Sequence, residues 1–280
     1  MGDIINAIIL GLIQGLTEFL PVSSSGHLEI GKFILGDAMP AEESMLMTVV
    51  LHFGTALATI YVFRKDVMDI IMGFLGIGTL PNELIAKANI LNERHEYRNF
   101  VYKIVLSMIP AVIVGLVFEK QIEAFFSQNI LLVCTMLLVT GILLLITEWA
   151  KSQNRSVTYA DAIIVGVAQA IAILPGISRS GATISTSIML GIDKSKAARF
   201  SFLMVVPLIF GKIAKDLLDG DFGNGNYSFL ALAVGFVTAF FTGIFACKVM
   251  IELVKKAKLS YFAYYCFAIG ILGIAYIYLK

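Results

Sequence analysis

The chain has 280 residues, of which 58% are hydrophobic and only 15% are charged. Soluble domains are about 45–50% apolar and about 25% charged, so the composition excludes a water-soluble globule and also a disordered chain. The net charge of +1 gives no electrostatic reason to expect a nucleic-acid partner. Long apolar runs without alternation of apolar and polar residues exclude a β-barrel. We therefore expect an all-α integral membrane protein embedded in a lipid bilayer.

The first apolar stretch, residues 4–36, is interrupted near its middle by Pro21 and by Ser23, Ser24 and Ser25. Proline ends a helix because it has no N–H donor, and serine can cap the helix that follows. Each half is too short to cross a membrane, so the pattern predicts a re-entrant helix–break–helix hairpin. Irregular backbone at membrane depth needs cover from protein or a polar cavity, which makes this break a candidate site.

A second interrupted stretch, residues 159–191, contains a break at Pro175-Gly176. Runs of about 20 apolar residues, long enough to span, follow each interrupted stretch. They lie near 44–63, 99–118 and 129–149, and then near 197–218, 227–247 and 260–279. A hairpin followed by three spans thus occurs twice, which predicts one membrane domain over 1–280 built from repeats 1–150 and 151–280.

The two breaks also resemble each other when the first is shifted by 155 positions. The matched pairs are Gly11 with Gly166, Gln14 with Gln169, Ser23 with Ser178, Ser25 with Ser180, and Gly26 with Gly181. Three spans is an odd number, so the second repeat is inverted relative to the first. We expect the two hairpins to enter from opposite sides and to meet near the midplane, as in transporters with inverted repeats.

Basic residues predict the orientation. Fifteen of the 21 Lys and Arg residues lie on one side, five lie on the other, and Arg179 is set aside as a site residue. The richer side comprises Lys103 and the segments 64–98, 150–158, 192–199 and 248–259. The positive-inside rule makes this side cytoplasmic and both termini external. Residues 66–98 are expected to form an amphipathic or loop excursion on the inner surface.

Arg179 lies at the second break, within an apolar stretch. An arginine at membrane depth costs at least about 2.5 kcal/mol on insertion scales, so such residues are usually functional. One interpretation is an anion clamp, because the guanidinium fork suits phosphate oxygens. The alternative is a structural ion pair with Glu18 or Glu148. Nearby hydroxyls that can add neutral donors belong to Ser178, Ser180 and Thr183.

The first break carries more titratable groups. Gln14 and Glu18 are four residues apart and share a helix face, and a carboxylate there needs a cation, a metal or a proton. His27 follows Ser24 by three residues, a spacing that allows a nucleophile beside its base. The alternatives are that the serines cap a helix, and that His27 is a polar helix residue whose hydrogen bonds are made within the protein. His52, in a later span, either lines the same cavity or packs.

These residues carry a resemblance to a known family. The segment QGLTEFLPVSSSGH, from Gln14 to His27, resembles the first, glutamate-rich motif of the undecaprenyl-diphosphate phosphatase family, also known for bacitracin resistance. The segment PGISRSGAT, from Pro175 to Thr183, is similar to the second motif of that family. The order and separation of the two motifs fit, and the resemblance extends over essentially the whole chain.

The resemblance implies a membrane enzyme that removes one phosphate from a C55 polyprenyl diphosphate. This reaction recycles the lipid carrier of peptidoglycan synthesis, on which the cell wall and cell shape depend, and gives resistance to bacitracin. The resemblance further implies a divalent cation, Mg²⁺ or Ca²⁺, and a site that opens to the outer side of the bacterial cytoplasmic membrane. Assembly as a homodimer is left open.

Carried over residue by residue, the resemblance assigns catalysis to the first break and Arg179. Glu18 matches an acidic position of the first motif, and Gln14 stands where many members have glutamate, so these two are the expected metal ligands. The positions matched to catalysis are Glu18, Ser24, His27 and Arg179. The hydroxyls expected to bind the diphosphate are those of Ser23, Ser25, Ser178, Ser180 and Thr183. Whether Ser24 or water attacks, and whether His27 is a base or a nucleophile, stays open.

Two rival functions remain at this stage. A transporter or lipid flippase could use the same anion site, but binding an anion needs no base, and the spacing of Ser24 and His27 beside Glu18 favours chemistry. A purely structural scaffold gives no reason to bury a carboxylate, an imidazole and a guanidinium together.

Overall fold

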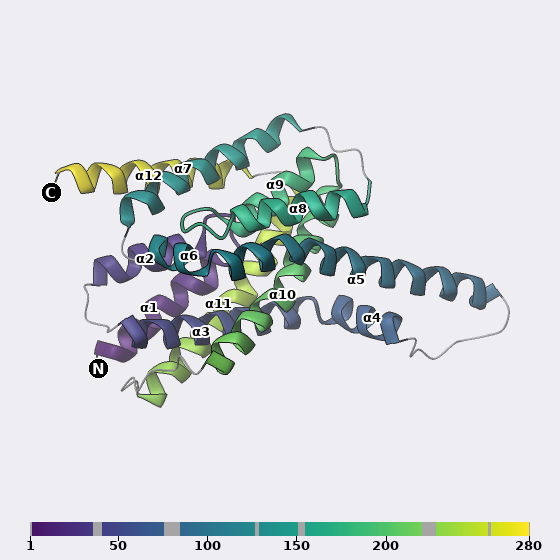
Figure 1. The fold of residues 1–280 in the computed structure, drawn as a ribbon, viewed down its shortest axis with the longest axis horizontal. Helices are drawn as coiled ribbons and strands as arrows, with labels where there is room; N and C mark the ends of the chain where they lie inside the picture. The colour runs from purple at the N-terminus through teal and green to yellow at the C-terminus, as the bar shows by residue number, and fades with distance from the viewer. Residues whose placement is uncertain are drawn as a thin grey trace.

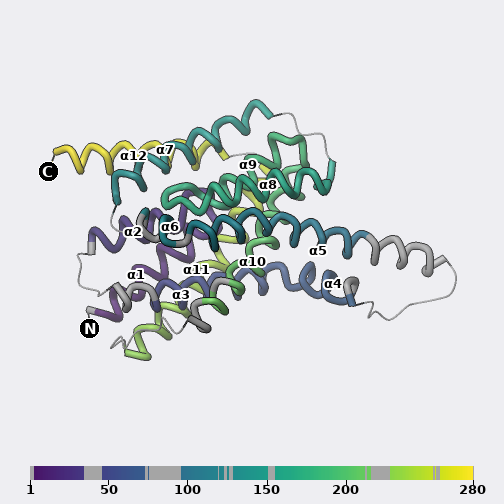
Figure 2. The backbone as a smooth tube through the Cα atoms, in the orientation of Figure 1, coloured from purple at the N-terminus to yellow at the C-terminus, as the bar shows by residue number. Residues whose placement is uncertain are grey.

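The computed structural model describes residues 2–35, 41–75, 85–126, 129–150, 155–219, 228–256 and 259–279. Within these ranges the chain is helical, with a single isolated β-bridge between Arg155 and Ile192 (Figure 1). The helices are α1 (Gly2–Thr17), α2 (Ser24–Leu35), α3 (Ala41–Val62), α4 (Arg64–Leu75), α5 (Ile85–Val117), α6 (Glu119–Phe126), α7 (Ile130–Ile146), the 3₁₀ turn η1 (Thr147–Trp149), α8 (Tyr159–Ile171), α9 (Arg179–Met189), α10 (Lys194–Asp219), α11 (Phe229–Lys255) and α12 (Ser260–Leu279). Figure 2 follows the path of the chain.

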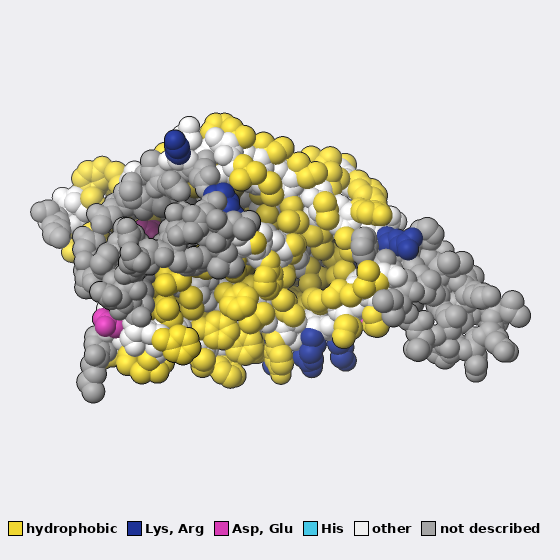
Figure 3. All heavy atoms as spheres, turned by 60° about the horizontal axis from the view of Figure 1, so that its bottom comes forward, with side chains coloured by type: hydrophobic (Ala, Val, Ile, Leu, Met, Phe, Trp, Pro, Cys, Tyr) yellow, Lys and Arg dark blue, Asp and Glu magenta, His cyan; other side chains and the backbone are white. Residues whose placement is uncertain are grey.

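The prediction of an all-α multi-pass membrane protein is confirmed. Among the described residues, five helices are long and apolar enough to span, and a sixth span results if α3 and α4 count as one bent pair. Apolar side chains dominate the described part of the face in Figure 3. Exposed apolar residues of the chain include Phe241 at 64% and Leu272 at 66% exposure. A bilayer accepts such a surface, whereas water does not.

The boundaries of several elements differ from the expectation. The excursion predicted over 66–98 is in part the helix α4, bent by 76° from α3, and in part the start of α5, which runs unbroken into its span. The loop expected over 248–259 is mostly helix, because α11 continues to Lys255. Helix α6 was not expected at all. Lys151, Lys258 and Pro81 lie outside the described residues.

Both interrupted stretches are helix–break–helix units. Helix α1 packs against α2 across the break at 18–23, and α8 packs against α9 across the break at 172–178. The helices α2, α8 and α9 have 12, 13 and 11 residues, which is shorter than the roughly 20 residues a span needs. Each unit therefore reaches a depth at which its break must be covered by protein.

The first helix of each hairpin packs on a span from the other half of the chain. Helix α1 packs mainly against α11, where a Cβ added to Gly11 would lie 2.8 Å from the carbonyl oxygen of Gly235. Helix α8 packs mainly against α5, where a Cβ added to Gly166 would lie 2.5 Å from the carbonyl oxygen of Ser107. Close approach at small residues is how helices associate in membranes. This reciprocal packing is what a duplicated, interlocked unit requires, while the repeat bounds 1–150 and 151–280 stay a prediction.

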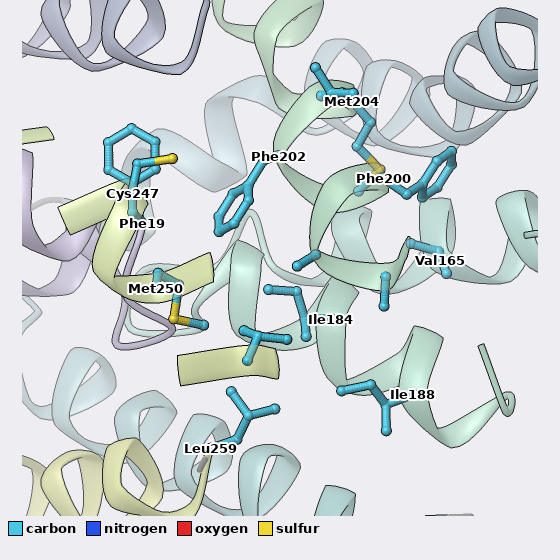
Figure 4. Close-up of a cluster of buried hydrophobic side chains, with 14 of the residues drawn as sticks. Phe19, Val165, Ile184, Ile188, Phe200, Phe202, Met204, Cys247, Met250 and Leu259 are labelled. Carbon is cyan, nitrogen blue, oxygen red and sulfur yellow. The ribbon is translucent and has the colours of Figure 1, made fainter. Parts of the chain in front are cut away.

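The largest buried cluster joins the first break to α9 and to the spans that surround them (Figure 4). Phe19, from the first break, is 1% exposed and meets the ring of Phe202 on α10 edge to face, with centroids 6.0 Å apart. Ile184 and Ile188 add the buried face of α9, and Met250 adds α11. The backbone beside Phe19 is thus held by tight packing on several helices.

Candidate active site

The two breaks are in contact with each other, as the sequence predicts. The Ser180 hydroxyl donates to the carbonyl oxygen of Leu20 at 3.4 Å. A Cβ added to Gly26 would lie only 3.1 Å from the Cα of Gly176, so the backbones approach closely at this point. Side chains from both breaks therefore share one site, although they are more than 150 positions apart in sequence.

The first break is shaped by local hydrogen bonds. The Thr17 hydroxyl donates to the Ile13 carbonyl at 2.6 Å at the end of α1. Ser23 adopts a positive φ of 70°, unusual for a residue with a side chain, and its hydroxyl accepts from the Gly26 N–H at 3.2 Å. The hydroxyl of Ser25 lies 3.3 Å from that of Ser23. Ser23 thus caps α2, as one alternative proposed, and its contact with a diphosphate stays a prediction.

The second break is anchored to α7. Thr140 donates to the Gly176 carbonyl at 3.0 Å and accepts from the Ser178 N–H at 2.9 Å. Gly176 has φ of 96°, and a Cβ there would lie 2.3 Å from the carbonyl oxygen of Val133, so only glycine fits. The Ser178 hydroxyl caps α9 by accepting from the Gly181 N–H at 3.0 Å. Arg179 is consequently placed in the first turn of α9 with little freedom of its backbone.

Glu18 lies at the centre of the polar side chains that the two breaks bring together, and it is 8% exposed. Its carboxylate accepts from Arg179, from the Ser24 hydroxyl at 2.7 Å and from the Gln14 amide at 3.0 Å. The Nε2 atom of His52, on α3, lies 4.0 Å from the same carboxylate. Removal of Arg179 would leave the charge of the buried Glu18 carboxylate without its cationic partner, so Glu18 depends on Arg179.

The partner of Arg179 is Glu18, whereas Glu148 lies in the turn after α7. The Arg179 side chain remains 29% exposed, and a guanidinium carries five N–H donors. Donors that do not face Glu18 can therefore reach a bound anion. The structural ion pair and the anion clamp, presented by the sequence as alternatives, are compatible in this geometry.

Ser24 and His27 do not form the expected nucleophile–base pair. Ser24 donates to Glu18 instead. The Nδ1 atom of His27 lies 2.8 Å from the Ser23 carbonyl oxygen, and its Nε2 atom lies 2.8 Å from the hydroxyl of Tyr265 on α12. The base nearest to Ser24 is thus the Glu18 carboxylate. Tyr265 was missed by the sequence reasoning, because one tyrosine among several in the last span carries no local signal.

The three predicted phosphate-binding hydroxyls of the second hairpin make hydrogen bonds within the protein. The Thr183 hydroxyl is fully buried and lies 2.6 Å from the hydroxyl of Ser201 on α10. The Ser178 hydroxyl lies 3.2 Å from that of Ser180. These side chains tie α9 into the fold, and their contact with substrate stays a prediction.

The residues present fit part of the ligand set of a hard cation. Gln14 Oε1 is a buried acceptor with no hydrogen-bond partner among the described residues, while the amide nitrogen of the same side chain donates to the Glu18 carboxylate. Among the described residues there is no group of three or more His, Cys, Asp or Glu side chains that could hold a metal. Mg²⁺ and Ca²⁺ prefer oxygen ligands and often take several from substrate and water. Glu18 and Gln14 can therefore hold such a cation only together with other oxygen donors.

Together, these features define a multi-pass helical membrane protein with a buried carboxylate–hydroxyl–guanidinium site where two interrupted hairpins meet. The sequence profile described as bacitracin resistance protein BacA matches residues 7–272, and the chain belongs to this family. A protein of Christiangramia forsetii named undecaprenyl-diphosphatase is 58% identical over 99% of both chains. Proteins with the same name from Bacteroides fragilis and Methanobrevibacter smithii are 43% and 38% identical, each over 96% of both chains.

Proposed function

We propose that this chain is an undecaprenyl-diphosphatase, which hydrolyses undecaprenyl diphosphate to undecaprenyl phosphate and inorganic phosphate. The observation that carries the proposal is the chain of contacts from Ser24 through Glu18 to Arg179, which joins a nucleophile, a base and an anion-binding cation. The identity of 58% to a relative of that name, over nearly the whole of both chains, supports the same substrate.

In the first step, Glu18 accepts the proton of the Ser24 hydroxyl as the Ser24 oxygen attacks the terminal phosphorus. The new O–P bond forms while the bond from this phosphorus to the bridging oxygen breaks, and undecaprenyl phosphate leaves with the electron pair. Arg179 donates to the oxygens of the transferred phosphoryl group, where negative charge is spread in the transition state. Its position in the first turn of α9 supplies this charge without rearrangement of the backbone.

In the second step, water attacks the phosphorus of phosphoserine 24, and the Ser24 oxygen leaves and regains a proton. We assign activation of this water to His27, which lies one turn after Ser24 on α2. The alternative is direct attack of water on the diphosphate, with Ser24 only orienting Glu18. The two routes differ in whether a phosphorylated Ser24 forms.

A divalent cation, Mg²⁺ or Ca²⁺, is proposed as cofactor, held by the Glu18 carboxylate and Gln14 Oε1 together with diphosphate oxygens. The buried and unpartnered Gln14 Oε1 supports this assignment. When bound, the cation supplies neutralisation of charge on the diphosphate.

The site is proposed to open to the outer side of the bacterial cytoplasmic membrane. The excess of Lys and Arg in the loops that precede α8 and α10 supports this orientation, because these loops then face the cytoplasm. The hydrolysis would serve recycling of the lipid carrier for cell-wall synthesis and would confer bacitracin resistance.

Release of inorganic phosphate by the purified chain tests the proposal. Undecaprenyl diphosphate in detergent, with Mg²⁺, Ca²⁺ or EDTA, should give phosphate only with a cation present. The rival, a lipid flippase or anion transporter, predicts movement of labelled substrate across liposomes without release of phosphate, and that result would overturn the enzyme assignment. The mass of the chain in nanodiscs decides between a monomer and a homodimer.

A further inference from the structure

We propose that Tyr265 is a positioning residue that holds the ring of His27 in the orientation needed for catalysis. The proposal rests on the proposed function, because it assigns a role within the same reaction. Tyr265 belongs to α12, 238 positions after His27, so the contact depends on the assembled fold.

The hydrogen bonds of His27 define its tautomer. Its Nδ1 atom lies 2.8 Å from the Ser23 carbonyl oxygen, and a carbonyl oxygen can only accept, so Nδ1 carries the proton. The neutral ring therefore has its basic lone pair on Nε2. This nitrogen faces the Tyr265 hydroxyl at 2.8 Å, and the hydroxyl donates to it. The tautomer of a histidine is generally set in this way by the partner of each nitrogen.

The Tyr265 hydroxyl suits both protonation states of His27. A phenol donates to Nε2 when the ring is neutral and accepts from it when the ring is protonated. Because Nε2 has a single lone pair, the Tyr265 O–H turns away from it when His27 takes the proton of the attacking water, and the phenol oxygen then accepts from the protonated ring. The two rings are also stacked, with centroids 5.5 Å apart and planes inclined by 13°.

The packing around Tyr265 keeps its hydroxyl at the first break. The next residue, Cys266, is fully buried, and its sulfur lies 4.0 Å from the Pro21 carbonyl oxygen. Helix α12 also packs along α7, the helix that anchors the second break through Thr140. The segment that carries Tyr265 is therefore fixed against the first break and against α7.

A single substitution tests the role of the Tyr265 hydroxyl independently of the role of its ring. Tyr265→Phe keeps the aromatic stacking and removes only the hydrogen bond to Nε2. The matched control is Tyr264→Phe, because Tyr264 is the preceding residue on α12 and is 60% exposed. A purely structural role for the Tyr265 ring predicts no difference between the two variants.

The first readout is nitrogen NMR of the full chain in nanodiscs, with ¹⁵N-labelled histidine. The chain has three histidines, and a His27→Gln variant identifies the His27 signals. We expect one protonated Nδ1 and one bare, hydrogen-bonded Nε2 in the wild type and in Tyr264→Phe. In Tyr265→Phe we expect the Nε2 signal to shift to that of a nitrogen without its hydrogen bond, while Nδ1 stays protonated because the Ser23 carbonyl still accepts from it. An unchanged His27 spectrum in Tyr265→Phe would overturn the proposal.

The second readout is steady-state release of phosphate from undecaprenyl diphosphate. Partners that orient an active-site group are worth about 10–100-fold in activity, so we expect kcat to fall at least about tenfold in Tyr265→Phe with KM unchanged. A kcat equal to that of Tyr264→Phe would also overturn the proposal, as would a rise of KM alone. If the wild type releases no phosphate, the proposed function fails, while the spectra still show whether Tyr265 holds His27.

Discussion

Arg179 donates to Glu18 across 161 positions of sequence, from the first turn of α9 to the break that follows α1. The pair joins the two hairpins and balances two charges that would each be costly in apolar surroundings. The guanidinium is still 29% exposed in this pair, so donors that do not face Glu18 remain for the phosphoryl group. The ion pair therefore serves the fold and the binding of the diphosphate at the same time.

The first prediction concerns the shape of the Arg179 side chain. Arg179→Lys keeps the positive charge but loses the planar fork of donors, and we expect phosphate release to fall by about 100-fold or more. The matched control is Arg64→Lys. Arg64 is an exposed residue at the start of α4, away from the two breaks, and its guanidinium donates a hydrogen bond to the Tyr61 carbonyl. Equal activity of both variants would contradict the clamp.

The second prediction separates the two routes of hydrolysis. Substrate labelled with ³²P in its terminal phosphate should leave label on Ser24 after a rapid acid quench, and Ser24→Ala should lose both the label and at least about 99% of kcat. Ser195→Ala, an exposed serine at the start of α10, is the control and should behave like wild type. Activity of the wild type without any labelled serine would favour direct attack by water.

The third prediction concerns the second break. Gly176→Ala places a Cβ against the Val133 carbonyl at a positive φ, so we expect a loss of at least about 1–3 kcal/mol of stability and a lower Tm in detergent. Gly115→Ala is the matched control, since Gly115 lies in the last turn of α5 and its Cβ would meet no described atom within 4 Å. That substitution should not lower the stability, because alanine loses less conformational freedom in a helix than glycine does. A Gly176→Ala protein as stable as wild type would show that the break tolerates side chains.

The fourth prediction concerns the cation. Gln14→Glu adds a second carboxylate beside Glu18, and affinity for hard cations rises with the charge of the ligands. We expect the Mg²⁺ concentration for half-maximal phosphate release to fall roughly tenfold, and activity in EDTA to stay absent. Gln121→Glu, on the exposed side of α6, provides the same change of charge away from the site and should leave the Mg²⁺ dependence unchanged. An identical Mg²⁺ dependence in both variants would remove Gln14 from the metal site.

The fifth prediction tests the orientation in the membrane. Cysteines introduced in place of Lys32 and Ser195 should react with impermeant maleimide from opposite sides, Lys32→Cys from outside and Ser195→Cys from the cytoplasm. The native Cys134, Cys247 and Cys266 are buried, so the background should be low. Labelling of both introduced cysteines from the same side would overturn the inverted arrangement.

The sequence predicted the fold class, both breaks and the meeting of Glu18 with Arg179, because these depend on patterns that are local or symmetric. Proline, serine and glycine mark the breaks in the sequence. In the structure Ser178 caps α9, and the backbone turns at Gly176 with a positive φ. An arginine in an apolar segment needs a carboxylate, and few are available.

The direction of the His27 side chain could not be predicted in this way. Spacing along α2 places His27 near Ser24, but the choice of partner depends on Tyr265, which the fold brings in from the last helix. The bend between α3 and α4 and the extension of α11 to Lys255 likewise depend on tertiary packing rather than on local hydropathy.

The long separation between Glu18 and Arg179 has a consequence for biogenesis. At a synthesis rate of about 5–20 residues per second, Glu18 leaves the ribosome about eight to thirty seconds before Arg179, which pairs with it in the folded protein. During that interval Glu18 has no Arg179 to pair with, and moving its unpaired carboxylate into the lipid would cost free energy. We therefore expect this hairpin to wait at the membrane–water boundary, or inside the insertion machinery, until the second hairpin arrives and the two enter the bilayer together.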